Sequence, residues 1–120
     1  MQLNVLKCKI HKARITKADL HYEGSLAIDQ DLMDKIGLKP FERILVVNIT
    51  NGERLETYAI QGERGTGEFL LNGSAARRGE VGDVITIMCF ANVSEEEYIE
   101  HSPKVIVLNE ENEIINQKGF

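Results

Sequence analysis

The dipeptide Asn51-Gly52 separates two runs of strand-forming residues and is the feature that most limits how this chain can fold. The runs cover residues 44–50 and 55–61 and are rich in Ile, Val, Leu and Thr. Asn-Gly tolerates the positive φ angles of a type I′ turn, which joins two antiparallel strands with the correct twist. We therefore expect a β-hairpin here, with its two strands adjacent in a sheet.

Three further segments have the composition of strands. Residues 83–90 follow a Gly-Asp turn and read DVITIMCF, and residues 104–108 follow Pro103 and read KVIVL. Short apolar runs of this kind are typical of buried strands. Residues 5–15 form a longer and more polar run, which we expect to be a bent strand.

Helix signals are few and short. Asp29 can cap a helix that runs through residue 36, because Gly37 is suited to the left-handed stop that follows. Ser94 and Glu97 have the spacing of a capping box and predict a second short helix. Residues 75–77 leave room for a single helical turn.

Short strands with few helices indicate a mainly β fold, and 120 residues suit one domain over residues 1–120. A closed barrel with mixed strand pairing is our preferred architecture, because closure removes exposed strand edges. Several of the strands are apolar on both faces. We therefore expect a homo-oligomer that covers the remaining apolar surface.

Charge and hydropathy argue against several partners. The chain has 14 Lys+Arg against 19 Asp+Glu, a net charge of −5, which is unfavourable for binding nucleic acid. No run approaches the ~18 apolar residues of a membrane helix, and the first residues lack a secretory apolar segment. Cys8 and Cys89 are the only cysteines and make no disulfide scaffold, so we expect a cytoplasmic protein with reduced thiols.

Three types of site find little support in the sequence. The potential metal ligands are Cys8, His11, His21, Cys89 and His101, but they contain no paired set with zinc spacing, so we expect no metal. The glycine-rich segment 62–67 matches no phosphate-loop motif and precedes a strand, which favours a simple turn. No G-x-S-x-G motif surrounds any serine, which argues against a triad hydrolase.

Two Gly-Ser dipeptides, Gly24-Ser25 and Gly73-Ser74, leave two interpretations open. Gly-Ser is common in ordinary turns. In a strained backbone, however, the serine Oγ can attack the preceding carbonyl and convert the amide into an ester. Elimination then cleaves the chain, and hydrolysis of the resulting dehydroalanine leaves a pyruvoyl group. Such a group binds amines as Schiff bases and withdraws electrons, as pyridoxal phosphate does.

A resemblance to a known family favours the second interpretation. The chain resembles the aspartate 1-decarboxylases, small pyruvoyl enzymes that make β-alanine for pantothenate, in collinear blocks that span almost its whole length. The blocks are KIH at 9–11, ADLHYEGS at 18–25, NGER at 51–54, TY at 57–58, GERGTG at 62–67, NGSAAR at 72–77 and VGD at 81–83. The chain departs from the family at Ser74, where alanine is expected, and the stretch from about Lys104 carries little of the match.

The resemblance implies a double-psi β-barrel that assembles as a homotetramer. It also implies self-cleavage between Gly24 and Ser25 into a β chain, residues 1–24, and an α chain, residues 25–120. Ser25 then becomes the pyruvoyl group, with no metal and no pyridoxal phosphate. The implied reaction converts L-aspartate to β-alanine and CO2, and whether a maturation helper protein starts the cleavage stays open.

The resemblance also implies a role for particular side chains. Ser25 forms the Schiff base, and Tyr58 is the proton donor, because a phenol carries its proton at neutral pH. Arg54 and Lys9 bind substrate carboxylates, and Arg54 has the planar fork suited to this. The remaining implied residues are Gly73, Ser74 and Ala75 for binding through backbone N–H groups, Thr57 for substrate binding and processing, and Gly24, Tyr22 and Asn72 for processing.

Simpler interpretations exist for two of these side chains. Arg54 and Tyr58 lie four residues apart, on one face of the expected strand, and could form a cation–π pair. Tyr22 could be an ordinary core residue. Thr57 should lie on the opposite face of the strand from Tyr58 if that strand is regular.

Overall fold

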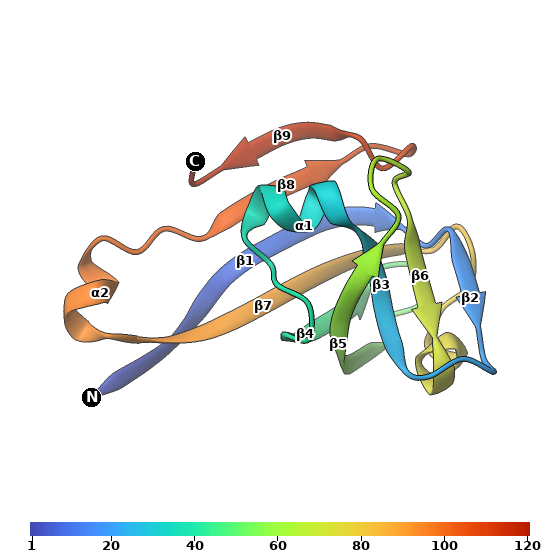
Figure 1. Cartoon of the computed structure of the whole chain (residues 1–120), viewed down its shortest axis with the longest axis horizontal. Coiled ribbons are helices and arrows are strands. Elements are labelled where there is room, and N and C mark those ends of the chain that lie inside the picture. Colours follow the sequence, from blue (N-terminus) through green and yellow to red (C-terminus); the bar gives the residue numbers. More distant parts are fainter.

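The computed structural model describes all residues from 1 to 120 and is mainly β. Figure 1 shows the long strands β1 and β7 side by side, with the short helix α2 at the end of β7. The elements are β1 (Gln2–Arg14), β2 (Lys17–Asp19), β3 (Ser25–Asp29), α1 (Gln30–Ile36), β4 (Arg43–Asn48), β5 (Arg54–Gly62), β6 (Phe69–Asn72), the 3-10 helix η1 (Gly73–Arg78), β7 (Val84–Ser94), α2 (Glu95–Ile99), β8 (Lys104–Leu108) and β9 (Ile114–Lys118).

The strands pair in the order β2-β6-β3-β5-β4-β7-β1-β8-β9. Pairing is mixed, as expected: β1–β8, β2–β6 and β3–β5 are parallel, and the other pairs are antiparallel. No ladder joins β2 to β9, so the sheet is not closed and the expectation of a sheet without open edges is wrong. The physical reason is that β8 and β9 extend the sheet beyond β1 and leave β9 as an edge.

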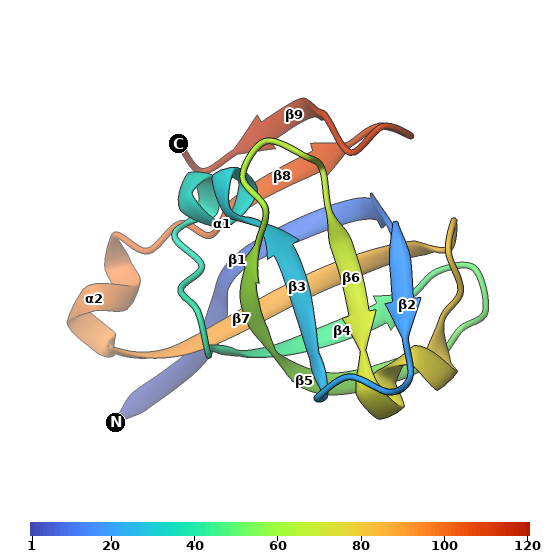
Figure 2. The same ribbon diagram turned by 45° about the vertical axis from the view of Figure 1, so that its right-hand side comes forward.

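The sheet is folded over on itself instead. Figure 2 shows β2, β6 and β3 crossing in front of β1, β7 and β4. The chain passes between these layers at Ile15 and Thr16, whose N–H groups donate to the carbonyls of Asp83 (3.0 Å) and Phe69 (2.9 Å). The core between the layers contains 21 buried residues, among them Ile10 of β1 and Leu26 of β3.

The predicted hairpin is confirmed as the antiparallel pair β4–β5, but its turn is wider than predicted. Asn48 N–H donates to the Glu53 carbonyl (2.8 Å), and Gly52 N–H donates to the Asn48 carbonyl (2.8 Å). Gly52 has a φ of 79°, whereas Asn51 is not among the residues with positive φ. The Asn48 side chain accepts hydrogen bonds from two loop N–H groups, which stabilises the longer loop.

The other predicted elements are also confirmed. Asp29 caps α1 and Gly37 ends it with a φ of 72°, while α2 begins with a complete capping box. Strand β1 is bent as expected, because its register against β7 shifts twice, between Leu6 and Cys8 and between Ile10 and Ala13. None of the helices is long and apolar enough to cross a membrane.

Candidate active site

Ser25 is the first residue of β3 and is buried, with 2% of its surface exposed. It lies opposite Asn72 in the antiparallel ladder between β3 and β6. The Asn72 side-chain Nδ2 donates a hydrogen bond to Ser25 Oγ at 3.2 Å. Asn72 Oδ1 is buried without a partner, which is unusual for a folded protein and often marks a functional position. The two residues form an isolated polar contact at the edge of an apolar core.

Gly73 brings the start of η1 directly against the Gly24–Ser25 segment. Its φ is 69°, and a Cβ atom there would lie 2.7 Å from both N and Cα of Gly24 and 2.9 Å from the Tyr22 carbonyl oxygen. Only glycine can adopt this conformation at such close range without displacing the backbone. The backbones of the two Gly-Ser dipeptides therefore lie side by side. Ala75 of η1 is buried and Ser74 is exposed.

Tyr58 of β5 lies near the same end of β3. The parallel pairing of β3 with β5 begins at Leu26 and Ala59, so Ser25 and Tyr58 are each one residue before the first pair. Exposure alternates along β5: Thr57 is half-buried, while Arg54 and Tyr58 are exposed. Thr57 and Tyr58 therefore point to opposite faces, as predicted.

The two simpler interpretations of these side chains are not supported. The cation–π contacts of the structure join Lys35 and Lys104 to Phe120 and do not involve Arg54. The Tyr58 ring lies beside the Phe41 ring instead, with centroids 6.3 Å apart. Tyr22 is 60% exposed, which excludes the alternative that it is a core residue. A turn after β2 holds it at the surface, where the His21 N–H donates to Asp19 Oδ1.

Comparison with known proteins identifies the family. A family profile described as aspartate decarboxylase matches residues 1–115. The chain belongs to the aspartate decarboxylase family. Proteins named aspartate 1-decarboxylase are similar over nearly the whole chain. The relative from Cupriavidus necator is 51% identical over 120 residues, all of both chains. The relative from Staphylococcus epidermidis is 53% identical over 110 residues, which are 92% of this chain and 86% of the relative. The relative from Bacillus licheniformis is 51% identical over 119 residues, which are 99% of this chain and 94% of the relative.

Membership of the aspartate decarboxylase family confirms the resemblance seen in the sequence blocks. The match also continues through β8 into the start of β9, so the C-terminal strands belong to it. The sequence blocks therefore underestimated this region.

Arg54 and Lys9 are both cations without a carboxylate partner in the chain, since neither takes part in an ion pair or in a side-chain hydrogen bond. Arg54 lies on the same face of β5 as Tyr58. Lys9 lies on β1, opposite Met88 of β7, and the strands β4 and β7 separate β1 from β5 in the sheet order. The sheet thus groups Ser25, Tyr58 and Arg54 on neighbouring strands and does not bring Lys9 into that group.

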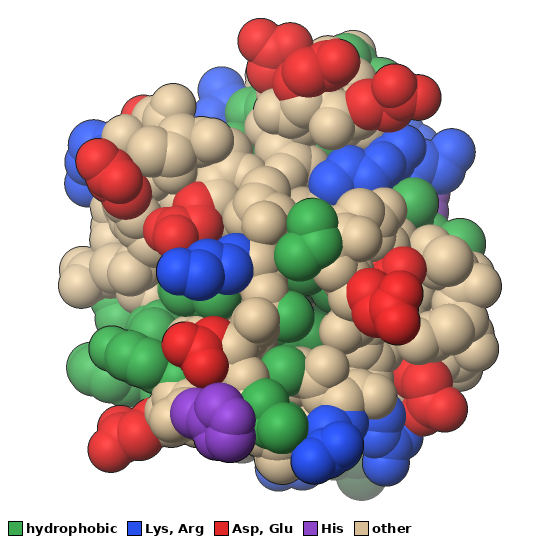
Figure 3. Space-filling model, turned by 90° about the vertical axis from the view of Figure 1, so that its right-hand side faces the viewer, with side chains coloured by type: hydrophobic (Ala, Val, Ile, Leu, Met, Phe, Trp, Pro, Cys, Tyr) green, Lys and Arg blue, Asp and Glu red, His purple; other side chains and the backbone are tan.

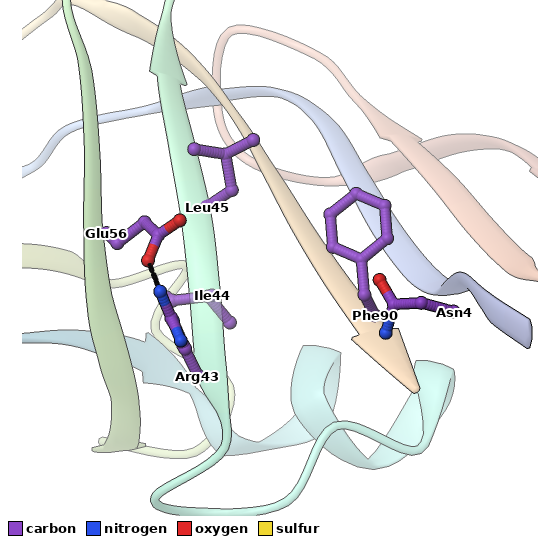
Figure 4. Close-up of a pocket in the computed structure, with 6 residues that line it drawn as sticks. All are labelled: Asn4, Arg43, Ile44, Leu45, Glu56 and Phe90. Carbon is purple, nitrogen blue, oxygen red and sulfur yellow. Dashed lines mark hydrogen bonds and ion pairs between the residues drawn. The ribbon is translucent and has the colours of Figure 1, made fainter. Parts of the chain in front are cut away.

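Ser25 does not line the three main cavities, which have volumes of about 340, 500 and 360 Å3. One of about 340 Å3 lies beside β4 and contains the Arg43–Glu56 ion pair and the Phe90 ring (Figure 4). Its remaining lining residues are Asn4, Ile44 and Leu45. Glu56 shares the outer face of β5 with Arg54 and Tyr58, so this cavity opens on the same side of the sheet as those side chains.

Two of the three histidines have structural hydrogen-bond partners for their rings. His11 Nδ1 lies 3.0 Å from Thr86 Oγ1, and His101 Nε2 lies 2.7 Å from the Leu6 carbonyl oxygen. Burial and the nearby charges of Lys9 and Lys12 lower the pKa of His11, which favours a neutral ring. No three His, Cys, Asp or Glu side chains gather as a metal-binding group. Figure 3 shows acidic and basic side chains interspersed on the face that carries β2 and β6.

Proposed function

We propose that this chain decarboxylates L-aspartate to β-alanine and CO2 for pantothenate and coenzyme A synthesis, after cleaving itself between Gly24 and Ser25. The observation that carries the proposal is the contact of Asn72 with the buried Ser25 hydroxyl, beside the Gly24 backbone on which Gly73 packs. Relatives named aspartate 1-decarboxylase, about half identical over their full length, support the same reaction.

The cleavage begins with attack of Ser25 Oγ on the Gly24 carbonyl carbon. The Asn72 amide holds the hydroxyl in place, and nothing lies within 4 Å of the position where a Gly24 Cβ would be. Glycine at position 24 places no side chain beside its own carbonyl. The Thr57 hydroxyl, on the half-buried face of β5, is suited to polarise that carbonyl. Exposed Tyr22 lies in the segment that must move when the ester forms. The products are residues 1–24 and residues 25–120.

Residue 25 then carries the pyruvoyl group, whose ketone accepts the substrate amine and the electrons released as the carboxylate departs. The site fits such a group. The position is buried, and Asn72 Nδ2, which donates to Ser25 Oγ, is a donor suited to a carbonyl oxygen at residue 25. The proposed reaction uses neither a metal nor pyridoxal phosphate.

The remaining residues bind the substrate and move the proton. Arg54 has no carboxylate partner within the chain and can hold a substrate carboxylate through two parallel hydrogen bonds. Backbone N–H groups of Gly73, Ser74 and Ala75 offer further donors to an anionic oxygen. Tyr58 donates the proton to the substrate Cα once CO2 has left. Lys9 supplies a second positive charge at the site in the assembled enzyme.

We also propose the assembly that the family resemblance implies. We propose a double-psi β-barrel, which the crossed layers joined at Ile15 and Thr16 support, and a homotetramer, which would bury exposed aromatic side chains such as Phe41 and Phe90. The two free thiols suit a cytoplasmic location. The net negative charge gives no support for nucleic acid as a partner.

A single preparation tests the proposal. We expect incubation of the purified protein to give two fragments that meet between residues 24 and 25, the larger without a free α-amine by intact mass. L-Aspartate should then yield β-alanine, and borohydride should trap the amine on the larger fragment. Cleavage only after addition of cell extract would indicate a maturation helper. A permanently uncleaved chain that makes no β-alanine would instead favour a non-catalytic domain that binds a small anion or a protein partner.

A further inference from the structure

Cys8 of β1 and Cys89 of β7 face each other inside the sheet. They are directly opposite in the antiparallel ladder, and they are 1% and 2% exposed. Both are free thiols. Opposite residues of an antiparallel pair point to the same face with Cβ atoms ~4.5–5.5 Å apart, and a disulfide needs ~3.5–4.5 Å. A small approach of the two strands is therefore enough to join the sulfur atoms.

The strand next to this pair has a built-in irregularity. Leu6 pairs with Phe90 and Cys8 pairs with Cys89, so Lys7 is an extra residue on β1. Such a bulge interrupts the ladder and bends the strand, which makes local adjustment of the backbone easier. The Lys7 ammonium group forms an ion pair with Glu42, at 2.7 Å.

Each sulfur is also the main influence on the ionisation of the other. The interaction with Cys89, followed by burial, raises the pKa of the Cys8 thiol, whereas the interaction with Cys8 lowers the pKa of the Cys89 thiol. The pair therefore releases its first proton from Cys89 more readily than its second from Cys8. A thiolate at Cys89 is the more reactive species toward oxidants.

We propose that Cys8 and Cys89 are a peroxide-sensitive dithiol that closes to a cross-strand disulfide. Cleavage at Gly24–Ser25, if it occurs as proposed above, places Cys8 on the short chain and Cys89 on the long chain. In the processed protein this disulfide is then the covalent bond that joins the two chains. The formation of the disulfide does not depend on cleavage, whereas its role as a link between chains rests on the proposed function.

The oxidant is hydrogen peroxide, which is close to water in size and suited to reach a buried thiol. The Cys89 thiolate attacks one peroxide oxygen, the O–O bond breaks, and hydroxide leaves, which gives Cys89–SOH. The Cys8 sulfur then attacks the Cys89 sulfur and displaces hydroxide, which takes the Cys8 proton and leaves as water. In total, two thiols and H2O2 give one disulfide and two waters. Closure also removes the weak bond that the Cys89 thiol donates to the Arg43 carbonyl at 3.5 Å.

The test uses the whole protein and treats it with hydrogen peroxide. The number of free thiols, titrated in denaturant, should fall from two to none for each short chain and long chain together. The combined mass should fall by two hydrogen atoms. Denaturing gels without reductant should show the chains joined, and reductant should release the fragments 1–24 and 25–120. The uncleaved Ser25→Ala protein should lose both thiols in the same way, which separates disulfide formation from processing.

Cys8→Ser and Cys89→Ser are the matched controls. Either variant should keep one titratable thiol, and its fragments 1–24 and 25–120 should separate without reductant. If a variant does not fold, the thiol and mass measurements on the wild-type protein still decide. The proposal is overturned if both thiols of the treated wild-type protein persist. The proposal is also overturned if a cysteine gains oxygen and no Cys8–Cys89 disulfide forms, or if the disulfides join separate copies of the protein. If Ser25→Ala forms the disulfide but the wild-type protein is never cleaved, the disulfide proposal stands and the proposed cleavage is refuted.

Discussion

Asn72 donates a hydrogen bond from its side-chain Nδ2 to the Oγ of Ser25, across 3.2 Å, between the paired strands β3 and β6. Both residues are buried, so neither can exchange this bond for water. The contact fixes the serine hydroxyl next to the Gly24 peptide group, on which Gly73 packs. The positions of these four residues thus explain why cleavage is proposed at this Gly-Ser dipeptide.

We predict that Ser25→Ala folds but stays uncleaved and inactive. Alanine has no Oγ to attack Gly24, and the change is small. The variant should lose about 1–3 kcal/mol of unfolding free energy, because the buried Asn72 amide loses its partner. Gel electrophoresis, intact mass and urea unfolding measure these effects. Normal fragments from this variant would place the cleavage elsewhere, with Ser74 next to be examined.

Ser74→Ala is the matched control for that experiment. Ser74 is exposed and its side chain makes no hydrogen bond, and alanine keeps the backbone N–H that we propose for substrate binding. We expect nearly normal cleavage and turnover, measured on the same gels and by β-alanine formation. Loss of cleavage in Ser74→Ala, with Ser25→Ala still cleaved, would reverse the roles of the two dipeptides.

We predict that Tyr58→Phe is processed normally but decarboxylates poorly. The ring beside Phe41 is kept and only the hydroxyl is lost. General acid catalysis supplies ~10²–10⁴-fold, so turnover should fall by that factor, about 3–5 kcal/mol in barrier. Borohydride with aspartate should still trap the amine. Tyr98→Phe, in the exposed helix α2, is the control and should leave turnover unchanged. Full turnover by cleaved Tyr58→Phe would exclude this phenol as the required donor.

Gly73→Ala should impair cleavage and destabilise the fold. The added methyl group would lie 2.7 Å from backbone atoms of Gly24, and the φ of Gly73 is 69°, so the backbone at Gly73 or Gly24 must shift. We expect a loss of at least about 1–3 kcal/mol in urea unfolding and slower fragment formation on gels. Gly52→Ala has a similar φ of 79° but nothing within 4 Å, so it measures the backbone strain alone. Equal effects of the two variants on cleavage would contradict the role of the close contact.

The Lys7–Glu42 ion pair should make stability depend on pH. Burial opposes ionisation of Glu42, but hydrogen bonds from the Lys39 N–H and Lys7 outweigh it and lower the pKa from 4.5. Because the folded pKa lies below the unfolded value, this stabilisation is present above pH 4.5 and is lost as the pH falls through the folded pKa. Glu42→Gln should therefore cost about 1 kcal/mol at neutral pH and little in acid.

Urea unfolding at the two pH values measures this difference, with Glu56→Gln as the control. The Arg43–Glu56 pair is more exposed, with side chains 80% and 53% accessible, and should contribute less at neutral pH. An equal loss for Glu42→Gln at both pH values would show that its charge is not the stabilising feature.

The sequence by itself determined the local elements and the family. Asp29, Gly37 and the Ser94 capping box act within a few residues, so their helices are readable without the fold. The hairpin between β4 and β5 follows from the apolar runs around Asn51-Gly52. Polar blocks around Gly24-Ser25 were enough to show the resemblance, and the alternation along β5 correctly separated Thr57 from Tyr58.

Only the tertiary structure decided which distant residues meet. Every residue of β3 is buried, so this strand lacks the alternation that identifies a strand in sequence, and β2 has only three residues. The Ser25–Asn72 bond and the Cys8–Cys89 pair join positions 47 and 81 residues apart, and strand register sets both. The wider hairpin loop, the open sheet edge and the exposure of Tyr22 likewise depend on long-range hydrogen bonding and packing, which no local pattern encodes.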